Sequence, residues 1–121
     1  MAIQDWSDEI LVADLADEPS LSEDMDLLIA RLEDAGGGSL AGRDIVLNFA
    51  EVTYVNSSNI TQLLRLRKRM TGGNGRLILC SLGDAVWSVM LVTGLDQVFE
   101  FHEDMLTALA TLQVDTEPAD D

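Results

Sequence analysis

The chain has 121 residues, 47% of them apolar, which suits one packed domain and is too short for two. Its 22 acidic residues against 7 basic ones leave a formal net charge of −15, a field that repels nucleic-acid phosphates and anionic lipid. We therefore expect no nucleic-acid partner and no direct membrane insertion. The most apolar stretch, Val86–Val92, is also far shorter than the ~20 residues that span a bilayer.

The N-terminal sequence and the single cysteine both favour a cytoplasmic protein. The opening residues, MAIQDWSDEI, have neither the basic segment nor the apolar run of a signal peptide. Cys80 is the only cysteine, so an internal disulfide is excluded. Because it stands in the apolar run Leu77–Cys80, we expect it to be buried as a small apolar side chain.

The first strand and helix follow from residue spacing. Residues Glu9–Ala16 predict a strand, and the S-x-x-E pattern of Ser20–Glu23 predicts the capped start of a helix. Apolar residues then recur at helical spacing: Leu21, Met25, Leu28, Ile29 and Leu32. Gly36–Gly38 are expected to end this helix.

The middle of the chain repeats this order. Asp44–Phe49 has the composition of a central strand, and Tyr54–Val55 suggests a second, very short β segment. A helix is expected from Ser57 or Ser58 to Thr71, ended by Gly72 and Gly73.

The last part of the chain predicts two more strands and two more helices. Arg76–Leu82 reads as a buried strand, and the S-x-x-D pattern of Ser81–Asp84 predicts the cap of a short helix that reaches Thr93 and closes at Gly94. Val98–Phe101 predicts a strand and His102–Leu112 a final amphipathic helix.

Strands that alternate with helices imply an α/β domain with a mixed, mainly parallel sheet of four to five strands and four helices. We expect residues 1–113 to form this domain and the acidic segment 114–121 to be a disordered tail.

No catalytic constellation is evident. The glycine clusters Gly36–Gly42 and Gly72–Gly75 follow helices and precede strands, the reverse of a phosphate-binding loop. The only histidine, His102, stands beside acidic residues and is expected to be a solvated helix-start residue rather than a base. We predict a protein that is not an enzyme and needs no metal or cofactor.

Two serines, Ser57 and Ser58, lie between Asn56 and Asn59 where a strand gives way to a helix. Asn56 and both serines are suited to cap that helix. A phosphate on either serine would also be tolerated there, because it would meet backbone amides and the positive end of the helix dipole.

The motif around these serines resembles the core motif of STAS domains, which include bacterial anti-sigma-factor antagonists and the cytoplasmic domains of sulfate transporters. The resemblance runs over residues 9–112. It is carried by Ile45–Phe49, Val52, Tyr54–Ile60, Leu63, Leu64, Gly75–Cys80, Ala85, Val86, Thr93–Leu95, Phe99, Ala108 and Leu109.

In the antagonists the motif usually reads Asp-Ser-Ser/Thr-x-Gly, and an anti-sigma factor that is a serine kinase phosphorylates the first serine. The resemblance implies that Ser57 is this phosphorylated residue and that Asn56, Ser58 and Asn59 form the switch surface around it. Two departures stand out. Asn56 replaces the Asp and loses its charge, and Asn59 replaces the Gly and adds a side chain beside the hydroxyl that could crowd a kinase.

Two groups of residues are candidates for partner binding. Arg65, Arg67, Lys68 and Arg69 are four of the seven basic residues, and they stabilise the end of their helix, dock an acidic partner, or do both. Trp87 and Leu91 lie one turn apart and are either core residues, an interface anchor or a homodimer contact.

The function that the resemblance implies is that of an antagonist which binds an anti-sigma factor and serine kinase, controlled by phosphorylation of Ser57. The alternative is a STAS scaffold, or a transporter-accessory subunit, that acts in a multi-protein assembly without phosphorylation. Asn56 is the residue that favours the alternative.

Overall fold

The computed structural model describes residues 3–33, 42–71 and 75–116, with residues 115 and 116 described by their backbone alone. Within these ranges one sheet has five strands in chain order: β1 (Ile3–Asp5), β2 (Ile10–Ala16), β3 (Asp44–Glu51), β4 (Leu77–Cys80) and β5 (Glu100–His102). β1 is antiparallel to β2, and every other neighbouring pair is parallel. The expected mixed, mainly parallel α/β sheet is confirmed.

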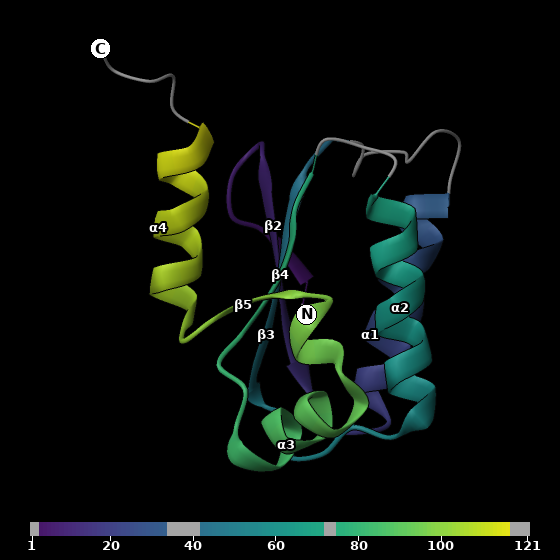
Figure 1. The fold of residues 1–121 in the computed structure, drawn as a ribbon. Helices are drawn as coiled ribbons and strands as arrows, with labels where there is room; N and C mark the ends of the chain where they lie inside the picture. Colours follow the sequence, from purple (N-terminus) through teal and green to yellow (C-terminus); the bar gives the residue numbers. More distant parts are fainter. Residues whose placement is uncertain (1–2, 34–41, 72–74, 117–121) are drawn as a thin grey trace.

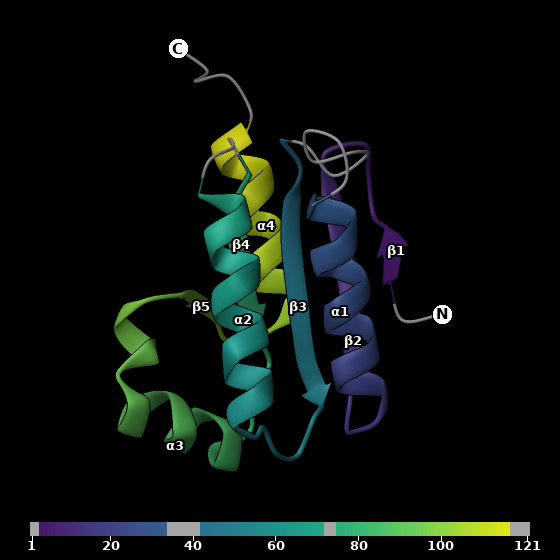
Figure 2. The ribbon, with the colours of Figure 1, turned by 90° about the vertical axis from the view of Figure 1, so that its right-hand side faces the viewer.

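Helices cover both faces of this sheet. They are α1 (Ser20–Glu33), α2 (Ser57–Met70), α3 (Asp84–Thr93) and α4 (Met105–Thr116), with a short 3-10 helix, η2 (Leu95–Gln97). Figures 1 and 2 show α1 and α2 side by side on one face, with α4 on the other. α3 lies at the end of the molecule where the strands finish and α2 begins (Figure 1). None of these helices is long and apolar enough, over the described residues, to cross a membrane.

The apolar runs of the strands divide between two cores because side chains alternate across a sheet. Leu11, Leu47 and Leu79 point toward the face covered by α1 and α2 and join the larger core. Val12, Val46 and Cys80 point the other way, toward Ala108 and Leu112 of α4. Cys80 is fully buried, as expected. Burial raises the pKa of its thiol, so it is a poor nucleophile.

Two of the predicted caps are wrong. Ser20 is already the first helical residue of α1, and the Glu18 carboxylate accepts the Ser22 amide proton at 2.7 Å in place of an S-x-x-E box. The cap of α3 is Gly83, with no side-chain hydrogen bond, and Ser81, which adopts a left-handed φ of 62°, lies outside the helix start. The predicted end of α3 is confirmed: Gly94 has φ 78° and closes the helix.

Other element boundaries differ from expectation. Tyr54–Val55 is not a strand, although Val55 is buried. The last strand contains His102, and α4 starts at Met105 because Asp104 accepts the Thr107 amide proton at 2.8 Å. α4 continues to Thr116, beyond the Leu112 predicted as its end. The expected stops at Gly36–Gly38 and at Gly72 and Gly73, and the segment 117–121, lie outside the described residues.

Candidate functional site

The start of α2 is built by a reciprocal pair of asparagines. Asn56, in extended conformation, is the N-cap, and its side-chain oxygen accepts the Asn59 amide proton at 2.9 Å. The Asn59 side-chain oxygen in turn accepts the Asn56 amide proton, also at 2.9 Å. This capping box satisfies two backbone donors that would otherwise lack partners. Ser57 and Ser58 are therefore not needed as caps, and both are exposed at the first two helical positions.

The side chain of Asn59 is buried against other residues of the domain, whereas the sequence led us to expect it beside the Ser57 hydroxyl, where it could crowd a kinase. It is fully buried, and its amide nitrogen lies 3.1 Å from Glu18 Oε2, 3.4 Å from Ser22 Oγ and 3.3 Å from Gln62 Oε1. Gln62 extends these contacts along α1, since its amide donates to the Ser22 carbonyl at 3.1 Å and to Asp26 Oδ1 at 2.8 Å. Asn59 thus ties the start of α2 to the start of α1.

Glu18 is the residue of this site that the sequence did not single out. Its carboxylate accepts hydrogen bonds from the Ser22 hydroxyl and amide and from Asn59. These bonds, those of Ser22 first, with a smaller contribution from the Asn56 side chain, hold the pKa of Glu18 below its ordinary value. Glu18 and Asn59 are 41 positions apart, so no local pattern could have indicated the contact.

The loop that leads into α2 is held by a second carboxylate. Asp17 accepts the Thr53 amide proton at 2.8 Å and its hydroxyl proton at 2.7 Å, and these bonds lower the pKa of Asp17. Tyr54, the next residue, is 63% exposed. The loop is therefore fixed at its backbone while it presents a large side chain beside the candidate switch.

The four basic residues of α2 do not form one stripe. Arg65 and Arg69, one turn apart, both pair with Glu33 of α1, at 3.4 and 2.7 Å. Their charges are partly neutralised within the domain, and the pairs link the two helices. Exposed pairs of this kind contribute about 0.2–1 kcal/mol each.

Arg67 and Lys68 lie on other sides of the same helix. The Arg67 Nε donates to the Val98 carbonyl at 3.2 Å, and Lys68 is exposed with no ion pair to a described residue. Arg67 is ten residues beyond Ser57, or about 15 Å along a helix. The structure thus separates the basic cluster from the serines.

Trp87 and Leu91 are surface residues of α3. Val86 and Met90 anchor the helix in the core, whereas Trp87 is 36% and Leu91 51% exposed. The Trp87 ring contacts Phe101 edge to face, with centroids 5.1 Å apart. Together with Leu82, His102 and Glu103, these two rings line a hollow of about 280 Å³. Figure 1 shows α3 at the same end of the molecule as the start of α2.

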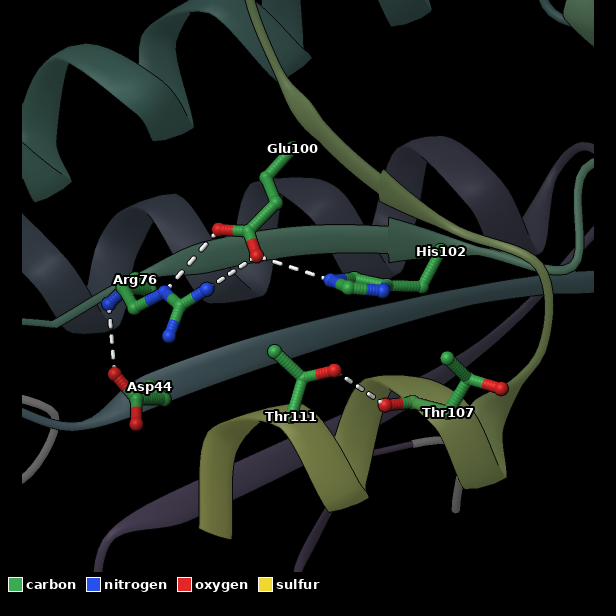
Figure 3. A network of polar contacts seen from close by, with 6 residues as sticks. All are labelled: Asp44, Arg76, Glu100, His102, Thr107 and Thr111. Atoms are coloured by element: carbon green, nitrogen blue, oxygen red, sulfur yellow. Dashed lines mark hydrogen bonds and ion pairs between the residues drawn. The ribbon is translucent and has the colours of Figure 1, made fainter. Parts of the chain in front are cut away.

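A second polar cluster lies on the α4 face of the sheet (Figure 3). Glu100 receives hydrogen bonds from the Arg76 guanidinium, and its Oε2 lies 3.0 Å from His102 Nε2. His102 ends β5 with only 18% of its side chain exposed. The expectation of a solvated helix-start residue is therefore wrong. Its partner is a carboxylate already paired with an arginine, an arrangement that stabilises the sheet edge.

This cluster predicts an acid-dependent loss of stability. Burial raises the pKa of Glu100, but the hydrogen bonds from Arg76 and His102 outweigh it and leave the pKa below its ordinary value. Because the folded pKa lies below the unfolded one, the stabilisation is complete above about pH 4.3 and is lost as pH falls through the folded value. Between about pH 6 and pH 3, wild type should lose more unfolding free energy than Glu100→Gln in urea titrations.

The matched control for this prediction is Glu103→Gln, which removes an exposed carboxylate from the same segment and should follow the wild-type pH profile. Equal profiles for wild type and Glu100→Gln would contradict the role of the ion pair.

Within the described residues, no group of histidine, cysteine or acidic side chains is arranged to hold a metal ion.

Comparison with known proteins agrees with this architecture. An anti-sigma-factor antagonist (STAS) domain protein from Planctomyces limnophilus superposes with a TM-score of 0.74 at 21% identity, covering 92% of this chain and 97% of that chain. The anti-sigma factor antagonist SpoIIAA in its unphosphorylated form gives 0.65 at 16% identity, covering 95% and 97%. The phosphorylated form of the Bacillus cell fate determinant SpoIIAA gives 0.66 at 17% identity, covering 91% and 96%.

At these identities the superpositions establish the fold. The sequence itself supplies the family, because residues 11–108, from β2 into α4, match the STAS domain. The match spans the capping box, the exposed serines and α3, in agreement with the resemblance seen in the sequence. The chain belongs to the STAS domain family.

Proposed function

We propose that this protein is an anti-sigma-factor antagonist that binds an anti-sigma factor with serine kinase activity and is switched by phosphorylation of Ser57. The observation that carries the proposal is the exposed Ser57 hydroxyl at the first position of α2, next to a helix cap that does not use it. The first amides of a helix lack intrahelical partners, and the dipole there favours negative charge. A phosphate on Ser57 would thus leave the fold intact and change the surface.

The solved relatives support this proposal. SpoIIAA, described as an anti-sigma factor antagonist and as a cell fate determinant, has the same fold in its unphosphorylated and phosphorylated forms. A phosphate is therefore compatible with this architecture. In this chain it would add charge to a surface that is already strongly acidic, and a partner that fits the neutral serine would be released.

The partner would contact the end of the molecule that carries Ser57. Trp87 and Leu91 on α3 are proposed as apolar anchors there, and Ser58 as part of the switch surface. The basic residues Arg67 and Lys68 are proposed to extend the contact along α2, whereas Arg65 and Arg69 are already engaged by Glu33. In this function the protein is a cytoplasmic kinase substrate and binding partner, not an enzyme.

The test compares two neighbouring serines. Ser57→Ala and Ser58→Ala each remove one exposed hydroxyl from the same helical turn. Incubated with an extract of the source cell and Mg-ATP, wild type and Ser58→Ala should each gain one phosphate by intact-mass spectrometry, and Ser57→Ala none. In pull-downs, Ser57→Asp should retain the anti-sigma factor less well than Ser57→Ala. Phosphate on Ser58, or a bound kinase that never modifies Ser57, would contradict the proposal that phosphorylation of Ser57 controls binding.

A scaffold or transporter-accessory subunit that is not phosphorylated is the second candidate, and Asn56 is the observation that favours it. The cap holds an amide where the antagonists' motif has a carboxylate. If that carboxylate positions the serine or a kinase-bound cation, its loss slows phosphoryl transfer. A partner that binds wild type, Ser57→Ala and Ser57→Asp equally would favour this role.

A further inference from the structure

We propose that Glu18 is a positioning residue of the Ser57 switch: its carboxylate supplies, from the turn before α1, the negative charge that Asn56 lacks at the start of α2. This inference rests on the proposed function, because it gives Glu18 a role in the modification of Ser57. It joins the two departures from the antagonists' motif, Asn56 and Asn59, into one arrangement.

The contacts place the Glu18 carboxylate at the N-terminus of α2. Its Oε2 lies 3.1 Å from the buried amide nitrogen of Asn59, and its Oε1 lies 2.7 Å from the Ser22 backbone nitrogen. The carboxylate is thus anchored from both helices. A glycine at position 59 would have no side chain to hold it, so the asparagine there has a function of its own.

Ser57 lies next to a residue that Asn59 links to this carboxylate. The Asn59 side-chain oxygen accepts the Asn56 amide proton at 2.9 Å, its nitrogen lies 3.1 Å from Glu18 Oε2, and Ser57 follows Asn56 directly. The other carboxylates of the two-helix network are engaged elsewhere, Asp17 with Thr53 and Asp26 with Gln62. Glu18 is the carboxylate that these hydrogen bonds connect to the residue before Ser57.

Like charges near the start of one helix have a measurable effect. An ionised carboxylate opposes the second ionisation of a phosphate and so raises its second pKa from about 6. In water, two unit charges within about 10 Å of each other shift such a pKa by a few tenths of a pH unit. The helix dipole acts in the opposite direction, but equally in every variant at position 18.

The test needs no kinase. Phosphoserine is introduced at position 57 during translation, and the phosphate is titrated by phosphorus NMR at low ionic strength. Glu18→Gln, which keeps a hydrogen-bond acceptor, should lower the midpoint pH of the second phosphate ionisation by a few tenths of a pH unit. Asn56→Asp added to Glu18→Gln should restore it. Glu23→Gln removes an equal, exposed charge from the first turn of α1 and should leave the midpoint within about 0.1 unit.

Several results would overturn the role of Glu18. One is an unchanged midpoint in Glu18→Gln, and another is an equal shift in Glu23→Gln, which would indicate a general effect of net charge. A shift that persists in about 1 M salt, where the Debye length is about 3 Å, would indicate a structural change instead. Amide NMR spectra of each variant verify the fold. These outcomes are independent of whether any cell phosphorylates Ser57, so the two proposals can fail separately.

Discussion

Replacing Gly75 with alanine is expected to lower the free energy of unfolding by about 3 kcal/mol. A Cβ at this position would overlap the carbonyl oxygen of Arg43 and lie 2.8 Å from its carbonyl carbon. The two backbones cannot separate freely, because Arg76 is tied to the start of β3. Its amide donates to Asp44 Oδ1 at 2.7 Å, and its carbonyl accepts the Ile45 amide proton at 2.8 Å.

The control for this prediction is Gly83→Ala. Gly83 has φ −76°, and no atom beyond its two chain neighbours lies within 4 Å of the place that an added methyl group would take. The substitution should therefore cost less than about 1 kcal/mol in urea denaturation. A similar small loss in Gly75→Ala would mean that β3 and β4 can part at this point without cost.

Most of the fold was predictable because its elements carry local signals. The apolar stripe of α1, the run Asp44–Phe49 and the left-handed Gly94 each specify their element without reference to the rest of the chain. β1 carried no such signal. This strand, Ile3–Asp5, has three residues and one buried side chain. It forms through antiparallel backbone pairing with the edge of β2.

Two of the wrong predictions arose where another partner engages groups that the local pattern left unassigned. The S-x-x-E pattern at Ser20 is a sound local motif, but the Glu18 carboxylate already satisfies the Ser22 amide. His102 was expected to be in solvent because acidic residues follow it, yet pairing of β5 with β4 carries it beside Glu100. The first contact is local, whereas at His102 local propensity yields to a tertiary contact.

The candidate site was predictable in part for the same reason. The exposed serines and the cap at Asn56 follow from adjacent residues, so the sequence indicated them. The direction of the Asn59 side chain and the pairing of Arg65 and Arg69 depend on α1, which lies next to α2 only after folding. The sequence identified the basic residues, but it could not show which of them pair with Glu33 and which do not.

Replacing Asn59 with leucine, a side chain of similar size, is expected to destabilise the protein by about 3 kcal/mol. The substitution removes the acceptor of the Asn56 amide proton and the donor to Glu18 and Gln62. Loss of the cap costs about 1 kcal/mol, and polar groups left without partners add about 1–3 kcal/mol. Chemical denaturation of the variant, with Ser58→Ala as the exposed control of the same turn, measures the effect.

Asn59→Asp separates the two functions of this side chain. It keeps the oxygen that accepts the Asn56 amide proton but places a second carboxylate against Glu18. The variant should be destabilised at neutral pH, where both carboxylates are ionised, and should approach wild type as pH falls below about 4 and they are protonated. If the loss were independent of pH, the hydrogen bond to Glu18 would matter less than the cap. If Asn59→Leu were as stable as Ser58→Ala, the buried network would not hold the start of α2 in place, and Glu18 would have no fixed position beside Ser57.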